Sequence, residues 1–209
     1  MKWYLDDVRE MHAAAPYTFY IPSEEVLRQL KVGDLVKLIF TNEHPSSDGY
    51  GGERMWVKIT DVQGNQFEGV LDNEPYYLPI EVGTELSFGI EHICQTEYEE
   101  PDGEKWDYYA NTFVIVSADV LEREEFHFML RDNPNGEEDS GWSFLSGYED
   151  DDYLSDTENF LVVSIGVVLN MDDSILSIVQ QPPLCAYERD EEGTFQEIED
   201  YDWDGYLNG

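Results

Sequence analysis

The chain has 209 residues, of which 47 are acidic and 11 are basic, and its formal net charge is −36. A surface this negative repels nucleic acids, anionic membranes and other acidic proteins, so the partner that it favours is basic. Aromatic residues make up 14% of the chain. Because disordered acidic proteins are poor in aromatics, we expect the charge to coat a folded body.

The acidity is also consistent with two origins that involve no basic partner. The charge can serve solubility alone. A salt-loving source would account for the few lysines, but not for the many tyrosine, phenylalanine and isoleucine residues.

Sequence features that relate to targeting and to cysteine oxidation predict the compartment of the protein. No apolar run approaches the ~20 residues of a membrane span, and the first residues lack the pattern of a secretory signal. Cys94 and Cys185 lie far apart and fit no disulfide framework, so we expect reduced thiols in a cytoplasmic protein.

In the first half of the chain, the pattern predicts helices on an antiparallel, curled sheet. Apolar spacing favours a helix over residues 1–15, and Ser23 with two following glutamates marks the start of a second, short helix. Gly64-Asn65 lies between two strand-like runs and predicts a hairpin. The strand-like runs cover 34–40, 55–60, 66–71 and 86–90, and a loop rich in Gly and Ser covers 44–52.

In the second half, short apolar runs alternate with capping residues. Ser117 is placed to cap one short helix, and Asp172 or Asp173 is placed to cap another. The run 159–169 is apolar and β-branched, so a strand is favoured at its start. The remaining predicted strands are 112–116, 126–130 and 185–189.

An acidic stretch around Pro101-Asp102-Gly103 predicts a boundary between about residues 97 and 111. We therefore expect an α+β fold of two small modules, each an antiparallel sheet with a few packed helices. The modules would cover 1–100 and 112–209, joined by an acidic linker over 101–111. Residues 110–209, which include an acidic tail, carry 25 acidic and 3 basic side chains, so we expect charge-driven contacts there.

The second module contains a motif that is similar to a known family. The motif begins with the run 139–147, Asp-Ser-Gly-Trp-Ser-Phe-Leu-Ser-Gly, whose core is Ser140-Gly141-Trp142, Phe144 and Ser146-Gly147. It continues through Glu149, Tyr153, Asp156, Asn159, Leu169, Asp172, Ile175, Pro183 and Tyr187-Glu188-Arg189-Asp190. Over about residues 112–198 this order resembles a bacterial family of uncharacterised domains grouped with candidate immunity proteins of polymorphic toxin systems. The resemblance implies toxin neutralisation and supplies no catalytic residues.

The first module, over about residues 30–95, carries a fainter resemblance to a second uncharacterised bacterial family of small α+β modules. It rests on Arg54-Met55-Trp56-Val57, on the run 69–75, and on Gly83 and Ile90. This resemblance supplies no catalytic residues either.

Acidic and aromatic side chains lie close together in the second module and form the candidate binding set. The acids would speed encounter with a basic partner, and the aromatics would anchor it. The set is Glu137, Glu138, Asp139, Trp142, Tyr148, Asp150, Asp151, Asp152, Tyr153 and Trp203. Two interpretations of Trp142 stay open, an anchor in a recognition loop or a core side chain in a buried hairpin.

Two further patterns point to metals. Asp200, Asp202 and Asp204 match the start of a calcium loop, but the glutamate that would complete it is missing, so we expect an acidic tail. His92 and Cys94 would share one side of a strand, but zinc needs two more ligands. With no nucleophile–base set and no phosphate-binding loop either, we expect no catalytic residues, metal or cofactor.

We therefore expect a cytoplasmic, non-enzymatic binding protein that neutralises a basic toxin domain by occluding it. One alternative is a housekeeping scaffold or regulatory protein of unknown ligand, whose acidity serves only solubility. A second alternative is an enzyme or ligand-binding regulator, which would need a concave pocket with converging polar groups.

Overall fold

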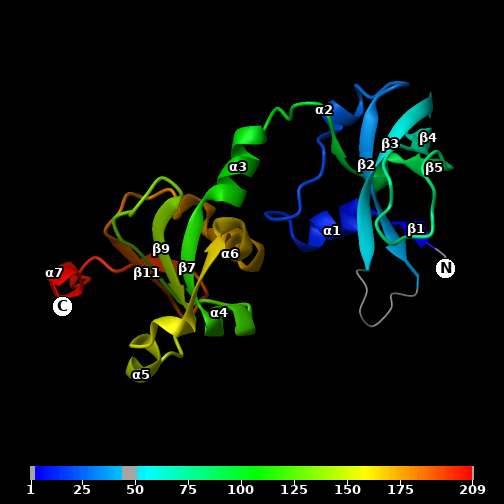
Figure 1. The fold of residues 1–209 in the computed structure, drawn as a ribbon. Helices are drawn as coiled ribbons and strands as arrows, with labels where there is room; N and C mark the ends of the chain where they lie inside the picture. The colour runs from blue at the N-terminus through cyan, green and yellow to red at the C-terminus, as the bar shows by residue number, and fades with distance from the viewer. Residues whose placement is uncertain (1–2, 44–50, 209) are drawn as a thin grey trace. The chain divides into compact units, whose positions relative to one another are not determined.

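The computed structural model describes residues 3–43 and 51–208, and the chain divides into two compact units, Met1–Gly103 and Glu104–Gly209. Both units combine a sheet with helices (Figure 1), which confirms the α+β class. No helix in the described ranges is long and apolar enough to cross a bilayer. Most of the loop predicted over residues 44–52 lies outside the described residues.

The first unit is a curled sheet with two short helices. Its elements are β1 (Trp3–Leu5), α1 (Val8–Ala14), α2 (Glu24–Leu27), β2 (Leu35–Asn42), β3 (Gly52–Gln63), β4 (Gln66–Leu71), β5 (Glu85–Gly89), η1 (Ile90–His92) and β6 (Ile93–Thr96). The strand order is β1-β2-β3-β4-β5, and β6 also pairs with β2. All pairs are antiparallel. Because only the three residues of η1 join β5 to β6, the sheet has to curl until its edges approach each other.

Local chemistry determines where these elements start. The Ser23 hydroxyl accepts a hydrogen bond from the Val26 N–H, which confirms the predicted short helix. The predicted hairpin is also confirmed, because β3 and β4 meet around Gly64, whose φ is +65°. The helix predicted over residues 1–15 is wrong at its start. Trp3 lies in β1 against the ring of Phe40, and the Asp7 carboxylate caps α1, so the helix begins only at Val8.

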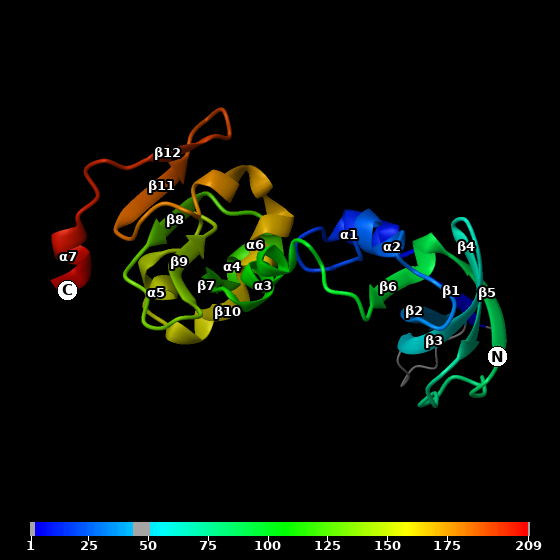
Figure 2. The same cartoon turned by 90° about the horizontal axis from the view of Figure 1, so that it is seen from above.

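The second unit is a sheet with three of its helices on one face. Its elements are α3 (Gly103–Asn111), β7 (Phe113–Ser117), α4 (Ala118–Arg123), β8 (Phe128–Arg131), β9 (Asp139–Leu145), α5 (Asp151–Leu154), η2 (Thr157–Asn159), β10 (Phe160–Ser164), α6 (Ile165–Met171), η3 (Asp173–Ser177), β11 (Cys185–Arg189), β12 (Phe195–Glu197) and α7 (Trp203–Asn208). The strand order is β10-β7-β9-β8-β11-β12. In Figure 2, α3, α4 and α6 gather beside the strands β7 and β9.

One strand pair in this sheet departs from the prediction of an antiparallel sheet. β7 and β9 are parallel, while the remaining pairs are antiparallel. The reason is that β8 and β9 form a hairpin that inserts β9 beside β7, whose direction it shares. The core lies on the helix side, where Val114, Trp142 and Phe144 are buried with Val168 of α6.

The remaining predictions for the second unit are confirmed in part. Ser117 caps α4 by accepting from the Val120 N–H, as expected. Asp172 also acts as a cap, but the turn that it starts is the 3₁₀ helix η3. Most of the stretch predicted as a linker over 101–111 is helix α3, because its Tyr109 side chain is buried and the helix thereby gains tertiary support.

Candidate functional site

The sheet face opposite the helices carries apolar side chains in its middle. Cross-strand pairing sets Val162 opposite Ile115 and Ile115 opposite Ser143, so these three side chains point to the same side. Val162 is 68% exposed and Ile115 is 41% exposed. By the same alternation the half-buried Phe113 and Leu145 lie on this side. We call these five residues, four apolar residues and Ser143, the outer strip.

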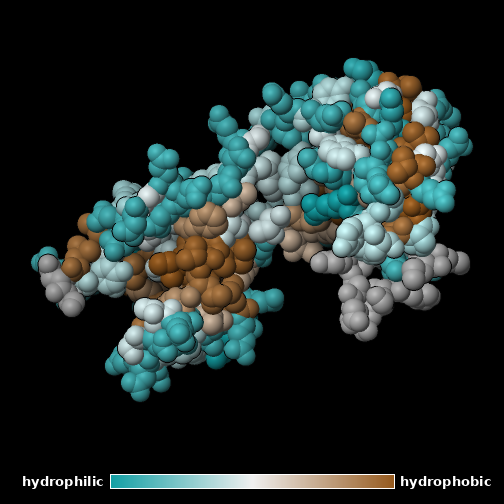
Figure 3. Space-filling model, viewed as in Figure 1, coloured by the Kyte–Doolittle hydropathy of each residue, from teal (hydrophilic) through white to brown (hydrophobic). Residues whose placement is uncertain are grey.

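The outer strip is unusual for a solvated sheet face. Figure 3 shows hydrophobic residues gathered over the region of β7, β9 and β10, with hydrophilic residues around them and over α5. Sheets with one face in water usually alternate apolar and polar side chains. A contiguous exposed apolar patch with a polar rim instead marks an interaction site.

Predicted acidic residues lie at both ends of the outer strip. Glu137 and Glu138 are exposed and directly precede β9, and the Glu138 carbonyl accepts a 2.7 Å hydrogen bond from the Phe113 N–H at the start of β7. Residues 150–152 follow β9 and begin α5, which lies at the start of β10 (Figure 1). Because β7 and β9 run in parallel, the two acidic groups flank the same apolar surface from opposite ends.

The predicted aromatic residues divide into buried and accessible ones. Trp142 is 1% exposed, and its Nε1–H donates to the Val179 carbonyl at 3.1 Å, so it is a core residue and not a surface anchor. Tyr148 is 60% exposed, with the Arg123 guanidinium 4.4 Å from its ring centre. Trp203 is half-buried against Tyr201. Tyr148 is therefore the most accessible of the predicted aromatics.

Tyr153 has a structural role in addition to its position near the acids. Its hydroxyl accepts a hydrogen bond from the Asp119 N–H at 3.2 Å, and its ring contacts Phe160 edge-on. The side chain thereby links α5 to α4 and β10. Replacing Tyr153 would disturb this arrangement, so it does not isolate the effect of a lost partner contact.

Several carboxylates around the outer strip hold loops in place. Burial raises the pKa of Glu149, but hydrogen bonds from the Ser117 hydroxyl and the Ser146 and Gly147 N–H groups outweigh it, so the net pKa is lowered. Asp139 follows the same pattern, with a lowered pKa and N–H groups of Asn135 and Gly141 as donors. These two acids stay ionised, and their hydrogen bonds fix the backbone segments that carry the exposed acids.

The ion pair between Asp172 and Arg189 ties η3 to β11. Both side chains are mostly buried, and Arg189 also lies over the Phe195 ring at 4.4 Å. Burial raises the pKa of Asp172, but hydrogen bonds from Arg189 and Ser174 outweigh that effect and lower it overall. The pair therefore stabilises the fold only while Asp172 is ionised.

This ion pair gives a pH-dependent prediction. Replacing Asp172 by Asn should lower the free energy of unfolding by about 2 kcal/mol near neutral pH, because a charged hydrogen bond is lost. A folded pKa below the unfolded one means that stabilisation is present above the unfolded pKa and is lost as pH falls through the folded pKa. Urea unfolding of both proteins from pH 7 to pH 2.5 should therefore show a gap that closes in acid. A gap that stays constant with pH would contradict the assignment.

The two metal-like patterns in the sequence, His92 with Cys94 and the aspartates of the tail, have separate roles in the structure. His92 lies in η1, where its Nδ1 accepts from the Gly89 N–H, whereas Cys94 lies in β6, so the pair does not share a strand. Asp202 accepts from the Gly205 N–H beside α7. Within residues 3–43 and 51–208, no group of three or more His, Cys, Asp or Glu side chains is placed to hold a metal ion.

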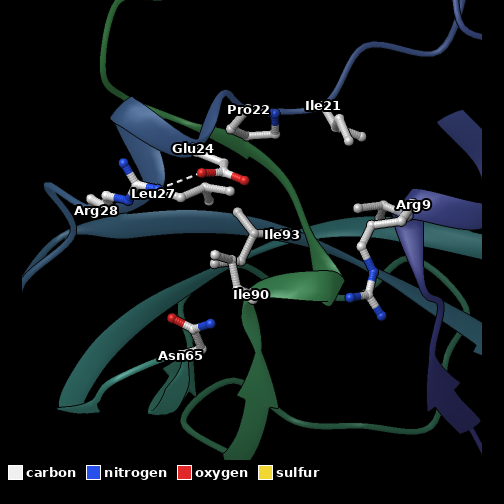
Figure 4. Close-up of a pocket in the computed structure, with 10 residues that line it drawn as sticks. Arg9, Ile21, Pro22, Glu24, Leu27, Arg28, Asn65, Ile90 and Ile93 are labelled. Atoms are coloured by element: carbon white, nitrogen blue, oxygen red, sulfur yellow. Dashed lines mark hydrogen bonds and ion pairs between the residues drawn. The ribbon is translucent and has the colours of Figure 1, made fainter.

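The first unit contains a separate concave site of about 520 Å³ (Figure 4). Ile90 and Ile93 lie on one side of it and Pro22 on another, while Arg9 and Arg28 approach from different elements. Each arginine already pairs with a carboxylate, Arg9 with Asp7 and Arg28 with Glu24. The cavity lining is thus mainly apolar, with Glu24 and Asn65 as further polar residues, and the charges of both arginines are locally neutralised.

Comparison with known proteins bears on the second unit. Residues 114–199 match the immunity protein Imm33 domain family. No curated protein and no solved structure gives a significant match to the chain. The Imm33 match confirms the resemblance predicted for residues 112–198. Because it spans less than half of the chain, the similarity describes the second unit.

Residues of the motif found in the sequence form the scaffold of this unit. The Ser140 hydroxyl donates to the Phe113 carbonyl and accepts from the Trp142 N–H, which joins β9 to β7. Asp156 caps η2, and Asp190 accepts N–H groups in the turn between β11 and β12. These motif residues therefore stabilise the fold, while Ser143 and Leu145 of the same run lie in the outer strip.

Sequence reasoning missed Ile115 and Val162 as surface residues. Both lie in runs of consecutive apolar residues, which predict strands without saying which face is covered. Such a run has apolar side chains on both faces, and only one face is covered by helices here. The missing alternation in 113–116 and 160–163 is the signal that could have revealed an exposed apolar face.

Proposed function

We propose that this protein is an immunity protein whose second unit binds a toxin domain through the outer strip and its acidic ends. The observation that carries the proposal is an exposed apolar surface, flanked by acids, on the unit that is similar to Imm33. The chain acts by binding and not by catalysis.

The acidic and the apolar side chains of this surface would have different roles in binding. Exposed acids accelerate encounter with a basic partner but are screened by salt beyond about 8 Å. Lasting affinity comes from desolvated apolar and aromatic groups. The outer strip and Tyr148 supply such groups, while 137–139 and 150–152 supply the charge.

A cationic partner surface suggests how inhibition works. Toxins that act on nucleic acids present basic grooves to phosphates. Carboxylates of this chain would occupy the places of those phosphates, while the outer strip covers apolar side chains at the rim of the groove. The toxin would be inactive because its substrate is excluded.

Growth rescue tests the proposal. Toxin domains of the kind neutralised by immunity proteins are expressed in a bacterial host, each with and without this protein. We expect growth to be restored, and the purified pair to form a complex that excludes the toxin's substrate. Restored growth without a complex, or a complex without protection, would contradict the proposal.

Neutralising the acids of α5 should mainly slow association. Changing Asp150, Asp151 and Asp152 together to Asn keeps the helix cap, because Asn caps as well as Asp. We expect the association rate to fall about tenfold at low salt, with little change in dissociation, because exposed charges act on encounter. Surface plasmon resonance at several salt concentrations measures both rates.

A matched variant controls for net charge. Glu74, Glu81 and Glu85 are exposed acids of the first unit, and changing them to Gln removes the same number of charges. This control should leave the association rate nearly unchanged. Equal slowing by both variants would show that overall charge, and not the acids beside the outer strip, attracts the partner.

A further inference from the structure

Strand β10 forms an unprotected edge of the second sheet. It is the last strand on its side and pairs only with β7. Its sequence, Phe160-Leu161-Val162-Val163-Ser164, contains no charge and no proline, and Leu161 is 42% exposed in addition to Val162. Proteins usually blunt such edges with lysine, proline or a covering segment, because an open edge recruits another strand.

The hydrogen-bond pattern shows which backbone groups this edge offers. The Ile165 N–H donates to the Thr112 carbonyl at 2.8 Å, so Ile165 belongs to a hydrogen-bonded pair with its neighbour. In an antiparallel ladder such pairs alternate with pairs whose backbone groups point away. Val163 and Leu161 therefore bond to β7, and the N–H and C=O of Val162 point outward.

We propose that an extended segment of the toxin pairs with β10 and continues the sheet beyond it. This inference rests on the immunity function proposed above and names the contact through which it works. The added strand would bond to the Val162 N–H and C=O. Its apolar side chains would extend the outer strip, and its basic side chains would meet the acids that precede β10.

The charge of this unit favours a basic toxin segment over a second copy of this chain as the partner that pairs with β10. Residues 110–209 carry 25 acidic against 3 basic side chains, and Asp156 and Glu158 are exposed just before β10. Two copies paired along this edge would bring together two units that each carry this large excess of acidic side chains, and this like charge opposes their association. A basic strand gains from the same acids, so the edge fits a cationic partner.

Two substitutions at one position separate backbone pairing from side-chain contact. Val162→Pro removes an N–H that points away from β7, and proline is tolerated on an edge whose N–H faces solvent. Val162→Thr keeps the N–H and the shape. We expect Val162→Pro to weaken the toxin complex about tenfold or more and Val162→Thr to weaken it much less. Equal effects of the two variants would overturn strand pairing.

Amide exchange of the unmodified chain provides a reading that no folding defect can mimic. In the toxin complex the Val162 amide should exchange much more slowly than in the free protein, while the Val163 amide, already bonded to β7, changes less. Thermal unfolding of Val162→Pro shows whether its sheet is intact. An unprotected Val162 amide in a stable complex overturns the inference and leaves the proposed function standing.

A synthetic peptide tests the edge without any toxin. A heptapeptide of alternating lysine and valine should shift the β10 amide resonances, whereas its glutamate–valine counterpart should not. If the lysine peptide shifts the β10 resonances but no toxin forms a complex, strand pairing at β10 is supported and the proposed function is contradicted. If the lysine peptide causes no shift and the toxin does not protect the Val162 amide, strand pairing at β10 is overturned. A salt-independent dimer that protects Val162 would identify a second copy as the occupant and overturn the inference.

Discussion

Replacing Trp142 by alanine should lower the free energy of unfolding of the second unit by about 3–5 kcal/mol. The side chain is 1% exposed and contacts Phe144 and Tyr187 in the core. Alanine would leave a cavity and remove the hydrogen bond that the indole donates to the Val179 carbonyl. Urea unfolding followed by circular dichroism measures the loss.

A conservative variant shows which part of this loss is packing. Trp142→Phe keeps most of the apolar volume but leaves the Val179 carbonyl without its donor, so we expect a smaller loss of about 1–2 kcal/mol. If Trp142→Ala left the unfolding midpoint unchanged but weakened toxin binding, Trp142 would be a surface contact and not a core residue.

The neighbouring Gly141 should be nearly as sensitive. Gly141→Ala is expected to cost about 3 kcal/mol, because two penalties add. The residue has a φ of +77°, and an added Cβ would lie 2.1 Å from the carbonyl oxygen of Asp132. It occupies an irregularity in β9, between the pairs of Phe113 and Ile115 with that strand.

Gly193 is the matched control for backbone strain. Its φ is +83°, but nothing lies within 4 Å of an added Cβ. Gly193→Ala should therefore cost only the strain, about 1 kcal/mol. Urea unfolding of both variants separates strain from collision. If the two variants lose equal stability, the close approach of Gly141 to Asp132 contributes nothing.

Much of the fold could be predicted because its signals are local. Ser23 and Ser117 are helix caps in the sequence and in the structure, and Gly64 marks a hairpin, because these features depend only on nearby residues. Trp3 shows the limit. Its spacing is helical, but pairing with Asn42 and contact with Phe40 place it in a strand.

The candidate site could be predicted only in part for a related reason. The acids Glu137, Glu138 and 150–152 are visible in composition, and they lie at the surface. Whether they belong to one surface depends on the parallel pairing of β7 with β9, which links segments on either side of β8. Trp142 could not be assigned to core or surface until the covered side of β9 was known.

The pairing order of the strands determines how soon after synthesis the outer strip can form. In the first unit, β2, β3 and β4 each pair with the next strand along the chain, and among the described strands only β6 returns to pair with the earlier strand β2. In the second unit, β7 can pair with β10, and β8 with β11, only after the later strand of each pair has been synthesised. Non-local pairing slows folding, because a long loop is ordered before its contacts form. The outer strip therefore forms only after β10 has been synthesised, so a newly made molecule gains this proposed binding surface late.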